Sequence, residues 1–180
     1  MKKTKNSAIG YSGKVTVKIL HGNKVVKTYR NHNTGTYRLF EFIARCLGNT
    51  YNEMYAPRFV RAFNIEGEFT EEEIINHLDD VISGPIAYNK IDVTTNVDSE
   101  NSLNDSSTVI FSFLIPASLI FDNQTRMNAL ALYSLTTYDD ESIASPMAYV
   151  KLDTNIQINE GSNILIEWSL AITNAKNDEE

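Results

Sequence analysis

Asn163 to Thr173 reads Asn-Ile-Leu-Ile-Glu-Trp-Ser-Leu-Ala-Ile-Thr, and this stretch decides the fold. Successive side chains of a strand point to opposite faces. One face of this stretch is wholly apolar and carries Ile164, Ile166, Trp168, Leu170 and Ile172. The other face is small or polar at most positions. We therefore expect a central sheet strand with one face on the core and the only tryptophan of the chain in its middle.

Short runs of apolar or alternating residues, bounded by turn residues, predict further strands. They cover residues 14–20, 24–29, 57–65, 86–93, 108–115, 127–136, 146–152 and 155–158. The first two runs flank His21-Gly22-Asn23-Lys24, whose Gly-Asn centre is typical of a two-residue hairpin turn. Lysines line the outer face of this hairpin, so we expect it at a sheet edge that must resist stray pairing.

An amphipathic helix is predicted over Tyr37 to Leu47, because apolar residues recur there at spacings of three and four. Its broad apolar face includes Phe40, Ile43 and Cys46. We expect the helix to pack across the open end or face of a sheet, with Cys46 as a buried, unreactive thiol. Gly48 is the expected left-handed stop.

A second, shorter helix is predicted from Thr70, because Thr70 and Glu73 have the spacing of a capping box. Gly84-Pro85 is its expected end. The chain is therefore predicted to be mainly β, an antiparallel β-sandwich of jelly-roll or immunoglobulin-like type with an N-terminal helix and a short inserted helix. The predicted core anchors are Phe40, Ile43, Phe111, Phe113, Tyr133 and Trp168.

The length of 180 residues fits one domain, predicted over residues 13–174, with an N-terminal arm at 1–12 and an acidic tail at 175–180. A net charge of −7 argues against a general nucleic-acid or anionic-membrane binder. The single cysteine excludes an intramolecular disulfide and a multi-cysteine zinc site. No apolar run is long enough for a membrane span or a signal peptide, so we expect synthesis and use in a cytoplasm or release by lysis.

Catalytic motifs are absent from the sequence. His21, His32 and His77 do not stand at metal-ligand spacing. Asp79-Asp80 and Asp139-Asp140-Glu141 are candidate carboxylate pairs for glycoside hydrolysis, but helix ends and turns carry acids of this kind anyway. Phosphate-binding glycine loops and nucleophile elbows are also missing. We expect no enzyme activity, cofactor, metal or small-molecule substrate.

Interaction residues are expected at the ends of the chain, in a basic first third and in one long polar loop over residues 94–107. The loop offers oxygen atoms of the kind that calcium binds, although its spacing matches no EF-hand. The candidate interaction residues are Lys2, Lys3, Lys5, Arg58, Arg61, Asp98, Glu100, Asn104 and Asp105, with Asn101 as a further oxygen donor in the loop.

Two parts of the sequence resemble known proteins. The run from Lys14 to Tyr29, followed by His32-Asn-Thr-Gly-Thr and by Leu39-Phe-Glu-Phe-Ile-Ala-Arg-Cys-Leu, resembles the opening of small virion proteins of tailed bacteriophages. The later segments Ala129-Leu-Ala-Leu-Tyr-Ser, Ala148-Tyr-Val-Lys-Leu and Ile164-Leu-Ile-Glu-Trp-Ser-Leu-Ala-Ile are similar to the closing strands of phage tail, collar and capsid-decorating modules. Related modules carry a glycine where this chain has Ala131.

The resemblance implies a non-enzymatic virion structural protein, made in the host bacterial cytoplasm and present in many copies in the particle. Its implied partners are capsid, portal or tail subunits and copies of itself, with no specific nucleic acid and no membrane. A carbohydrate-binding or host-adhesion module is the alternative, with exposed aromatic residues and the 94–107 loop as its binding site.

Overall fold

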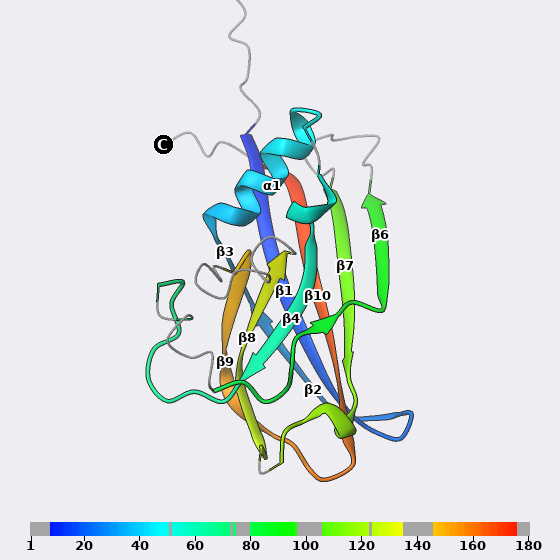
Figure 1. Cartoon of the computed structure of the whole chain (residues 1–180). Helices are drawn as coiled ribbons and strands as arrows, with labels where there is room; N and C mark the ends of the chain where they lie inside the picture. The colour runs from blue at the N-terminus through cyan, green and yellow to red at the C-terminus, as the bar shows by residue number, and fades with distance from the viewer. Residues whose placement is uncertain are drawn as a thin grey trace, which may run out of the picture.

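A computed structural model describes residues 8–50, 52–72, 74, 80–96, 106–122, 124–134 and 146–175. In this part of the chain, two antiparallel sheets of five strands and one α-helix make up the fold, which is mainly β (Figure 1). The elements are β1 (Ala8–His21), β2 (Lys24–His32), β3 (Thr34–Gly35), α1 (Tyr37–Leu47), the 3-10 turn η1 (Glu53–Tyr55), β4 (Pro57–Phe63), β5 (Ile86–Ala87), β6 (Lys90–Asn96), β7 (Ser106–Ile115), the 3-10 turn η4 (Ala117–Leu119), β8 (Arg126–Ser134), β9 (Ala148–Gln157) and β10 (Ser162–Ala175).

Strand β10 lies at the centre of the first sheet, whose order is β2-β1-β10-β7-β6. It pairs with β1 from Ala8↔Ala175 to His21↔Ser162 and with β7 on its other side. Trp168 stands opposite Val15 on one neighbour and Phe111 on the other. The predicted central strand is therefore confirmed, and its apolar face is buried at Ile164, Ile166 and Trp168, whereas Leu170 is only partly buried and Ile172 is 39% exposed.

The main core lies between this sheet and the second one, of order β3-β9-β8-β4-β5. Both sheets contribute to it, because inward-facing residues of β1, β7 and β10 pack against those of β4, β8 and β9. Four of the six predicted core anchors are buried, namely Phe111, Phe113, Tyr133 and Trp168. The prediction was wrong for Phe40, which is 48% exposed, and Ile43 is only partly buried.

The predicted hairpin is confirmed as β1 and β2, with Gly22 at a φ of 59°. Its glycine takes the left-handed conformation that the first position of the turn requires. Strand β2 is the edge of its sheet, as its lysines indicated. Strand β1 begins at Ala8, inside the segment predicted as an arm, and residues 1–7 lie outside the described residues.

The strand predicted over residues 86–93 is wrong, because the chain changes sheets within it. The backbone N–H of Tyr88 donates to Arg58 of β4, at 3.2 Å, and the next N–H, of Asn89, donates to Ser112 of β7, at 2.9 Å. Consecutive residues thus bond to different sheets. The run divides into β5 in one sheet and β6 in the other, while the two runs predicted at 146–152 and 155–158 are one strand, β9.

The outer face of the second sheet is covered by the chain that follows β4. Ile65, Phe69 and Ile74 pack there as a second apolar cluster with Phe63 of β4 and residues of β8. The predicted second helix falls mostly on residues 75–79, outside the described part. It does not extend to Gly84, because Val81 and Ser83 already form β-bridges with Phe63 and Ile120.

Asn128 fixes this covering segment to the sheet at a register shift between β8 and β9. Its side-chain oxygen accepts from the Ile65 N–H at 2.9 Å, and its amide nitrogen donates to the Ile65 carbonyl at 2.7 Å. Both residues are buried. The side chain therefore satisfies two backbone groups that have no access to water.

Replacing Asn128 with Ala should leave the Ile65 N–H and C=O buried without partners. Each such group costs about 1–3 kcal/mol, so we expect the free energy of unfolding to fall by roughly 2–4 kcal/mol in a urea titration. The matched control is Asn155→Ala, an exposed position of β9. A loss no larger than that of the control would contradict the role given to Asn128.

Candidate functional site

Most of the predicted interaction residues lie outside the described part of the chain, namely Lys2, Lys3, Lys5, Asp98, Glu100, Asn104 and Asp105. The other two occupy β4 but contact different tyrosines. Arg58 donates to the Tyr88 hydroxyl at 3.0 Å, and the Arg61 guanidinium lies 5.6 Å from the centre of the Tyr133 ring. The structure does not bring these two arginines together into one docking face.

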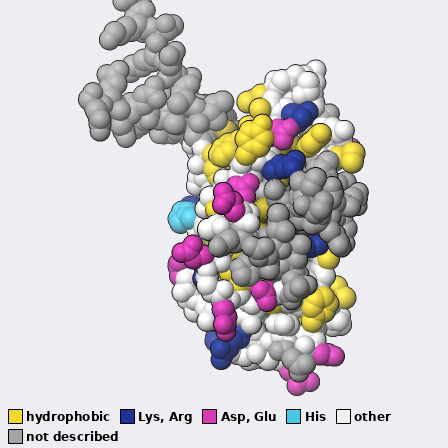
Figure 2. Space-filling model, turned by 60° about the vertical axis from the view of Figure 1, so that its left-hand side comes forward, with side chains coloured by type: hydrophobic (Ala, Val, Ile, Leu, Met, Phe, Trp, Pro, Cys, Tyr) yellow, Lys and Arg dark blue, Asp and Glu magenta, His cyan; other side chains and the backbone are white. Residues whose placement is uncertain are grey.

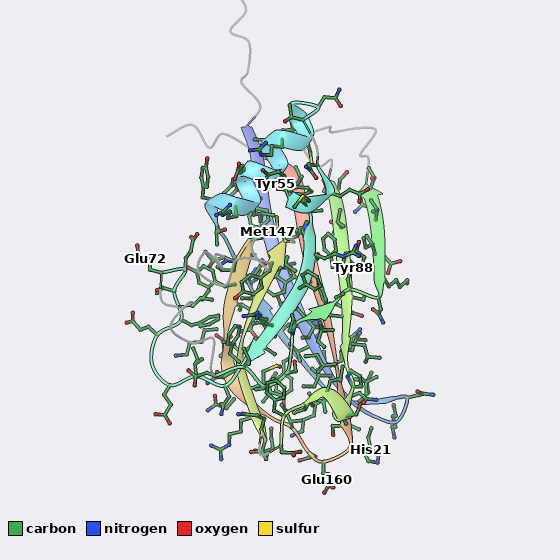
Figure 3. The ribbon with its side chains drawn as sticks, viewed as in Figure 1. His21, Tyr55, Glu72, Tyr88, Met147 and Glu160 are labelled. Carbon is green, nitrogen blue, oxygen red and sulfur yellow. The ribbon has the colours of Figure 1, made fainter. Side chains whose placement is uncertain are left out.

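The other chemical candidates of the sequence also remain apart where they are described. His21 and His32 are exposed, and His21 lies at the end of the molecule opposite α1, near Glu160 (Figure 3). The residues that the structure describes contain no group of three or more metal-binding side chains. They also contain no helix with the length and apolar character that crossing a membrane requires. His77, Asp79 and residues 139–141 lie outside the described residues.

The two most exposed large apolar side chains of the described residues, Tyr37 and Leu47, lie on α1 at one end of the molecule (Figures 1 and 2). Their position depends on how the sequence fixes the start of this helix. Thr36 is the N-cap, and its hydroxyl accepts from the Arg38 N–H at 3.2 Å. The same hydroxyl donates to the Pro146 carbonyl at 2.7 Å, and the Thr36 N–H donates to Met147 at 2.9 Å. The helix therefore starts at a fixed point beside β9.

The C-terminal end of α1 is a Schellman motif. The Thr50 N–H donates to the Arg45 carbonyl at 2.9 Å, and the Asn49 N–H donates to the Cys46 carbonyl at 3.3 Å. Asn49 takes the left-handed conformation, with a φ of 55°, while Gly48 has a φ of −80°. The predicted left-handed stop at Gly48 was therefore wrong by one residue.

The helix buries a narrow strip of its surface. Leu39 is fully buried, and the side chains of Phe42 and Ile43 are partly covered. Every residue from Cys46 to Thr50 is exposed, so the last turn projects beyond the sheets. This projection explains why the predicted burial of Cys46 was wrong, since its thiol is exposed.

The outward face of α1 is also apolar, because Tyr37, Phe40, Ala44 and Leu47 follow one another at helical spacing. Tyr37 is 74% exposed and Leu47 is 72% exposed. Phe40 contacts the Tyr11 ring edge-on at 5.8 Å between ring centres. Met54 of η1, which is also exposed, follows the helix in the chain. We call the residues Tyr37, Phe40, Ala44, Leu47 and Met54 the helix-end surface.

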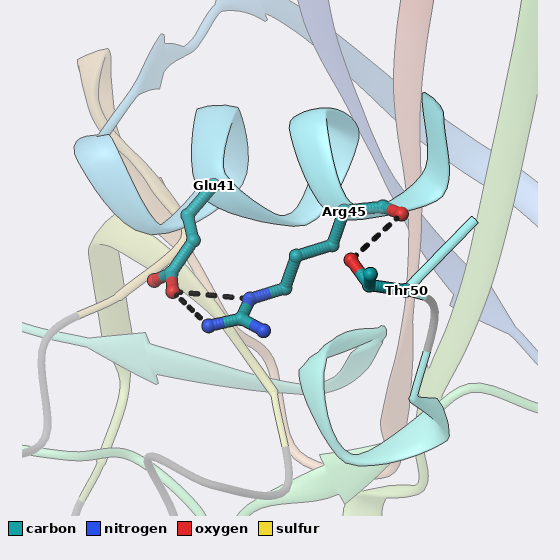
Figure 4. Close-up of polar contacts among 3 residues, drawn as sticks. All are labelled: Glu41, Arg45 and Thr50. Atoms are coloured by element: carbon teal, nitrogen blue, oxygen red, sulfur yellow. Dashed lines mark hydrogen bonds and ion pairs between the residues drawn. The ribbon is translucent and has the colours of Figure 1, made fainter. Parts of the chain in front are cut away.

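An ion pair between Arg45 and Glu41 borders this surface (Figure 4). Arg45 donates from Nη2 to Glu41 Oε1 at 2.7 Å and from Nε to the same oxygen at 3.1 Å. Its guanidinium also lies 4.4 Å from the centre of the Tyr55 ring, which joins α1 to η1. Arginine is charged at any physiological pH, and the hydrogen bonds to Glu41 raise the pKa of Arg45 further.

A shallow hollow of about 500 Å³ lies over the helix and is lined by Tyr37, Phe40, Glu41, Ala44, Arg45 and Thr50. Its lining combines the aromatic rings of Tyr37 and Phe40 with the Arg45–Glu41 ion pair, whose opposite charges neutralise each other. Such a surface gains free energy by excluding water from apolar groups. It is therefore suited to contact with an apolar region of another macromolecule.

No family model, curated protein or solved structure matches this chain.

The left-handed conformation of Asn49 predicts that Asn49→Gly will stabilise the protein, because glycine adopts a positive φ without steric cost. Glycine loses more conformational entropy on folding than asparagine, so the net gain in the free energy of unfolding should be small, about 0.5 kcal/mol. Asn49→Ala is the control at the same position, because it keeps a Cβ at positive φ and should not stabilise the protein. Loss of stability in Asn49→Gly would contradict this cap assignment.

Exposure of Cys46 predicts complete alkylation of the folded protein by a small maleimide. Partial burial raises the pKa of this thiol above its ordinary value of 9.0, and only the thiolate reacts. The alkylation rate should therefore climb with pH, and its midpoint should lie at a higher pH than the value measured for the same thiol in the urea-unfolded protein. Mass spectrometry at a series of pH values measures the rate, and a midpoint below that value would contradict the assigned environment.

Proposed function

We propose that the protein is a non-enzymatic structural component of a bacteriophage virion, in which the helix-end surface contacts another virion protein. The observation that carries this proposal is the exposure of several large apolar side chains on one face of α1 and on η1. Monomeric proteins rarely keep such side chains together in contact with water unless the patch has an interaction role. The resemblance of the β segments to phage tail and capsid modules supports the virion context.

The two sheets form the scaffold in this proposal, as a β-sandwich. Inward-facing residues of both sheets share one core, which is the arrangement that sandwich folds require. The jelly-roll and immunoglobulin-like types stay predictions. The scaffold carries α1 at one end, where the Thr36 hydroxyl holds the start of the helix to the Pro146 carbonyl and Arg45 contacts the Tyr55 ring of η1.

Partner contact at the helix-end surface is favourable mainly through burial of apolar side chains. Complete burial of a Leu or Phe side chain contributes about 1.5–3 kcal/mol. Tyr37 and Leu47 have most of this gain still available, since each is more than 70% exposed. Because Arg45 is paired with Glu41, the contact does not require the partner to supply a neutralising charge.

Leu47→Ser should reduce incorporation of the protein into virus particles at least about tenfold, which corresponds to 1.4 kcal/mol of binding. Leu119→Ser, at an exposed leucine of η4, is the matched control and should leave incorporation unchanged. Quantitative mass spectrometry of purified particles of the virus that encodes this gene measures both. Absence of the wild-type protein from particles would refute the virion role, and normal incorporation of Leu47→Ser would refute the role of the surface.

A further inference from the structure

The edge strand β6 keeps apolar side chains exposed that lie on the core-facing side of its sheet. Ile91 stands opposite Phe111 and Val93 opposite Val109, and Phe111 belongs to the main core. Nevertheless Ile91 is 42% exposed and Val93 is 66% exposed. On β6, the core-facing side of the sheet is therefore in contact with solvent.

The second sheet is too narrow at this edge to cover β6. Its outermost strand, β5, has two residues, Ile86 and Ala87, and pairs only with Phe59 and Val60 of β4. Tyr88 fills the boundary, with its ring 5.8 Å from that of Phe111 and on the β6 side of the molecule (Figure 3). Beyond Tyr88, the residues that the structure describes place β7 as the sole strand partner of β6.

The two edges of this sheet differ in their protection against pairing. Edge strand β2 carries Lys24, Lys27 and Arg30, and its pairing with β1 shifts register between Ile19 and Leu20. Unpaired charges and irregular pairing are the features by which natural edge strands resist a second chain. In β6 the charged residues are Lys90 and Asp92, and they neutralise each other at 2.8 Å. No other strand of the described residues pairs with the outer edge of β6, so its backbone N–H and C=O groups lie there beside an apolar, uncharged strip.

We propose that β6 pairs antiparallel with β6 of a second copy of this chain, about a two-fold axis that passes Val93. In this register Val93 stands opposite Val93 of the partner subunit, Asp92 opposite Thr94, Ile91 opposite Thr95 and Lys90 opposite Asn96. In this register the exposed Val93 side chains of the two subunits stand opposite each other, and no two residues of like charge do. A register centred on Asp92 places two carboxylates opposite each other, which is unfavourable. Pairing about Val93 joins two five-stranded sheets into one continuous sheet.

This interface is small, so the association is weak and depends on concentration. Stable protein interfaces bury about 1,200–2,000 Å² in total, and one pair of seven-residue strands provides less. Weak pairing suits a protein that a larger assembly brings to high local concentration, where each contact adds to others. The proposal concerns a different surface from the helix-end surface, so each is tested separately.

Sedimentation equilibrium over a series from micromolar to millimolar protein tests the association. We expect a monomer–dimer equilibrium for the wild type and a dissociation constant at least about tenfold higher for Val93→Lys, because the charge is placed at the two-fold axis. Val26→Lys, at an exposed valine of edge strand β2, is the matched control and should dimerise normally. A wild-type protein that stays monomeric throughout the series overturns the proposal, as does equal weakening by both substitutions.

Spin labels identify which edge pairs. In a Cys46→Ser background, labels on Thr94→Cys should broaden each other magnetically in the dimer, because diagonal residues of neighbouring strands lie about 7–8 Å apart. Labels on Thr28→Cys, in β2, should remain sharp. Broadening at Thr28→Cys instead, or a dimer that Leu47→Ser abolishes, assigns the interface to β2 or to the helix end and overturns the β6 proposal. A dimer unaffected by Leu47→Ser supports β6 whatever the fate of the virion role.

Discussion

The pairing of β10 with β1 on one side and β7 on the other is the constraint on which the rest of the structure depends. It holds Trp168 between Val15 and Phe111, with the indole fully buried. The indole N–H has no hydrogen-bond partner among the described residues, so the ring contributes through packing volume and apolar area. The second sheet then packs its own apolar face against this wall, and α1 crosses one end of the two layers.

Residues with strict alternation were predicted well from the sequence. Strands β10 and β7 each bury one face, so apolar residues recur at every second position along them. Their β-branched and aromatic side chains also favour strands. The hairpin at Gly22 and the bounds of α1 were also predictable, since turn and cap residues act locally. The sequence did not predict features that depend on where another element of the fold ends. The run 86–93 has a uniform pattern, yet its backbone bonds pass to a different sheet at Tyr88 and Asn89.

For the candidate site on α1, sequence-based prediction had the same limit. Its apolar periodicity indicated a helix correctly, and the spacing of Tyr37, Phe40, Ala44 and Leu47 was visible in the sequence. Periodicity does not say how much of a helix the sheets cover. Phe40 lies on the outward face of the helix, and Cys46 lies on the last turn, which projects beyond the sheets, so both are exposed although the sequence predicted both as buried. The exposed valine of β6 was equally unpredictable, since its exposure results from the shortness of β5.

The position of β10 also has a consequence for how the protein reaches its native state on the ribosome. The strand at the centre of the first sheet is the last strand of the described chain to be synthesised. Until Ser162–Ala175 emerges, the β1–β2 hairpin and the β6–β7 pair each keep an open edge, and no local contact joins them. The first sheet can therefore close only after Ser162–Ala175 has been synthesised, and a translation pause before residue 162 prolongs the time during which two unfinished sheet edges are exposed in the cell.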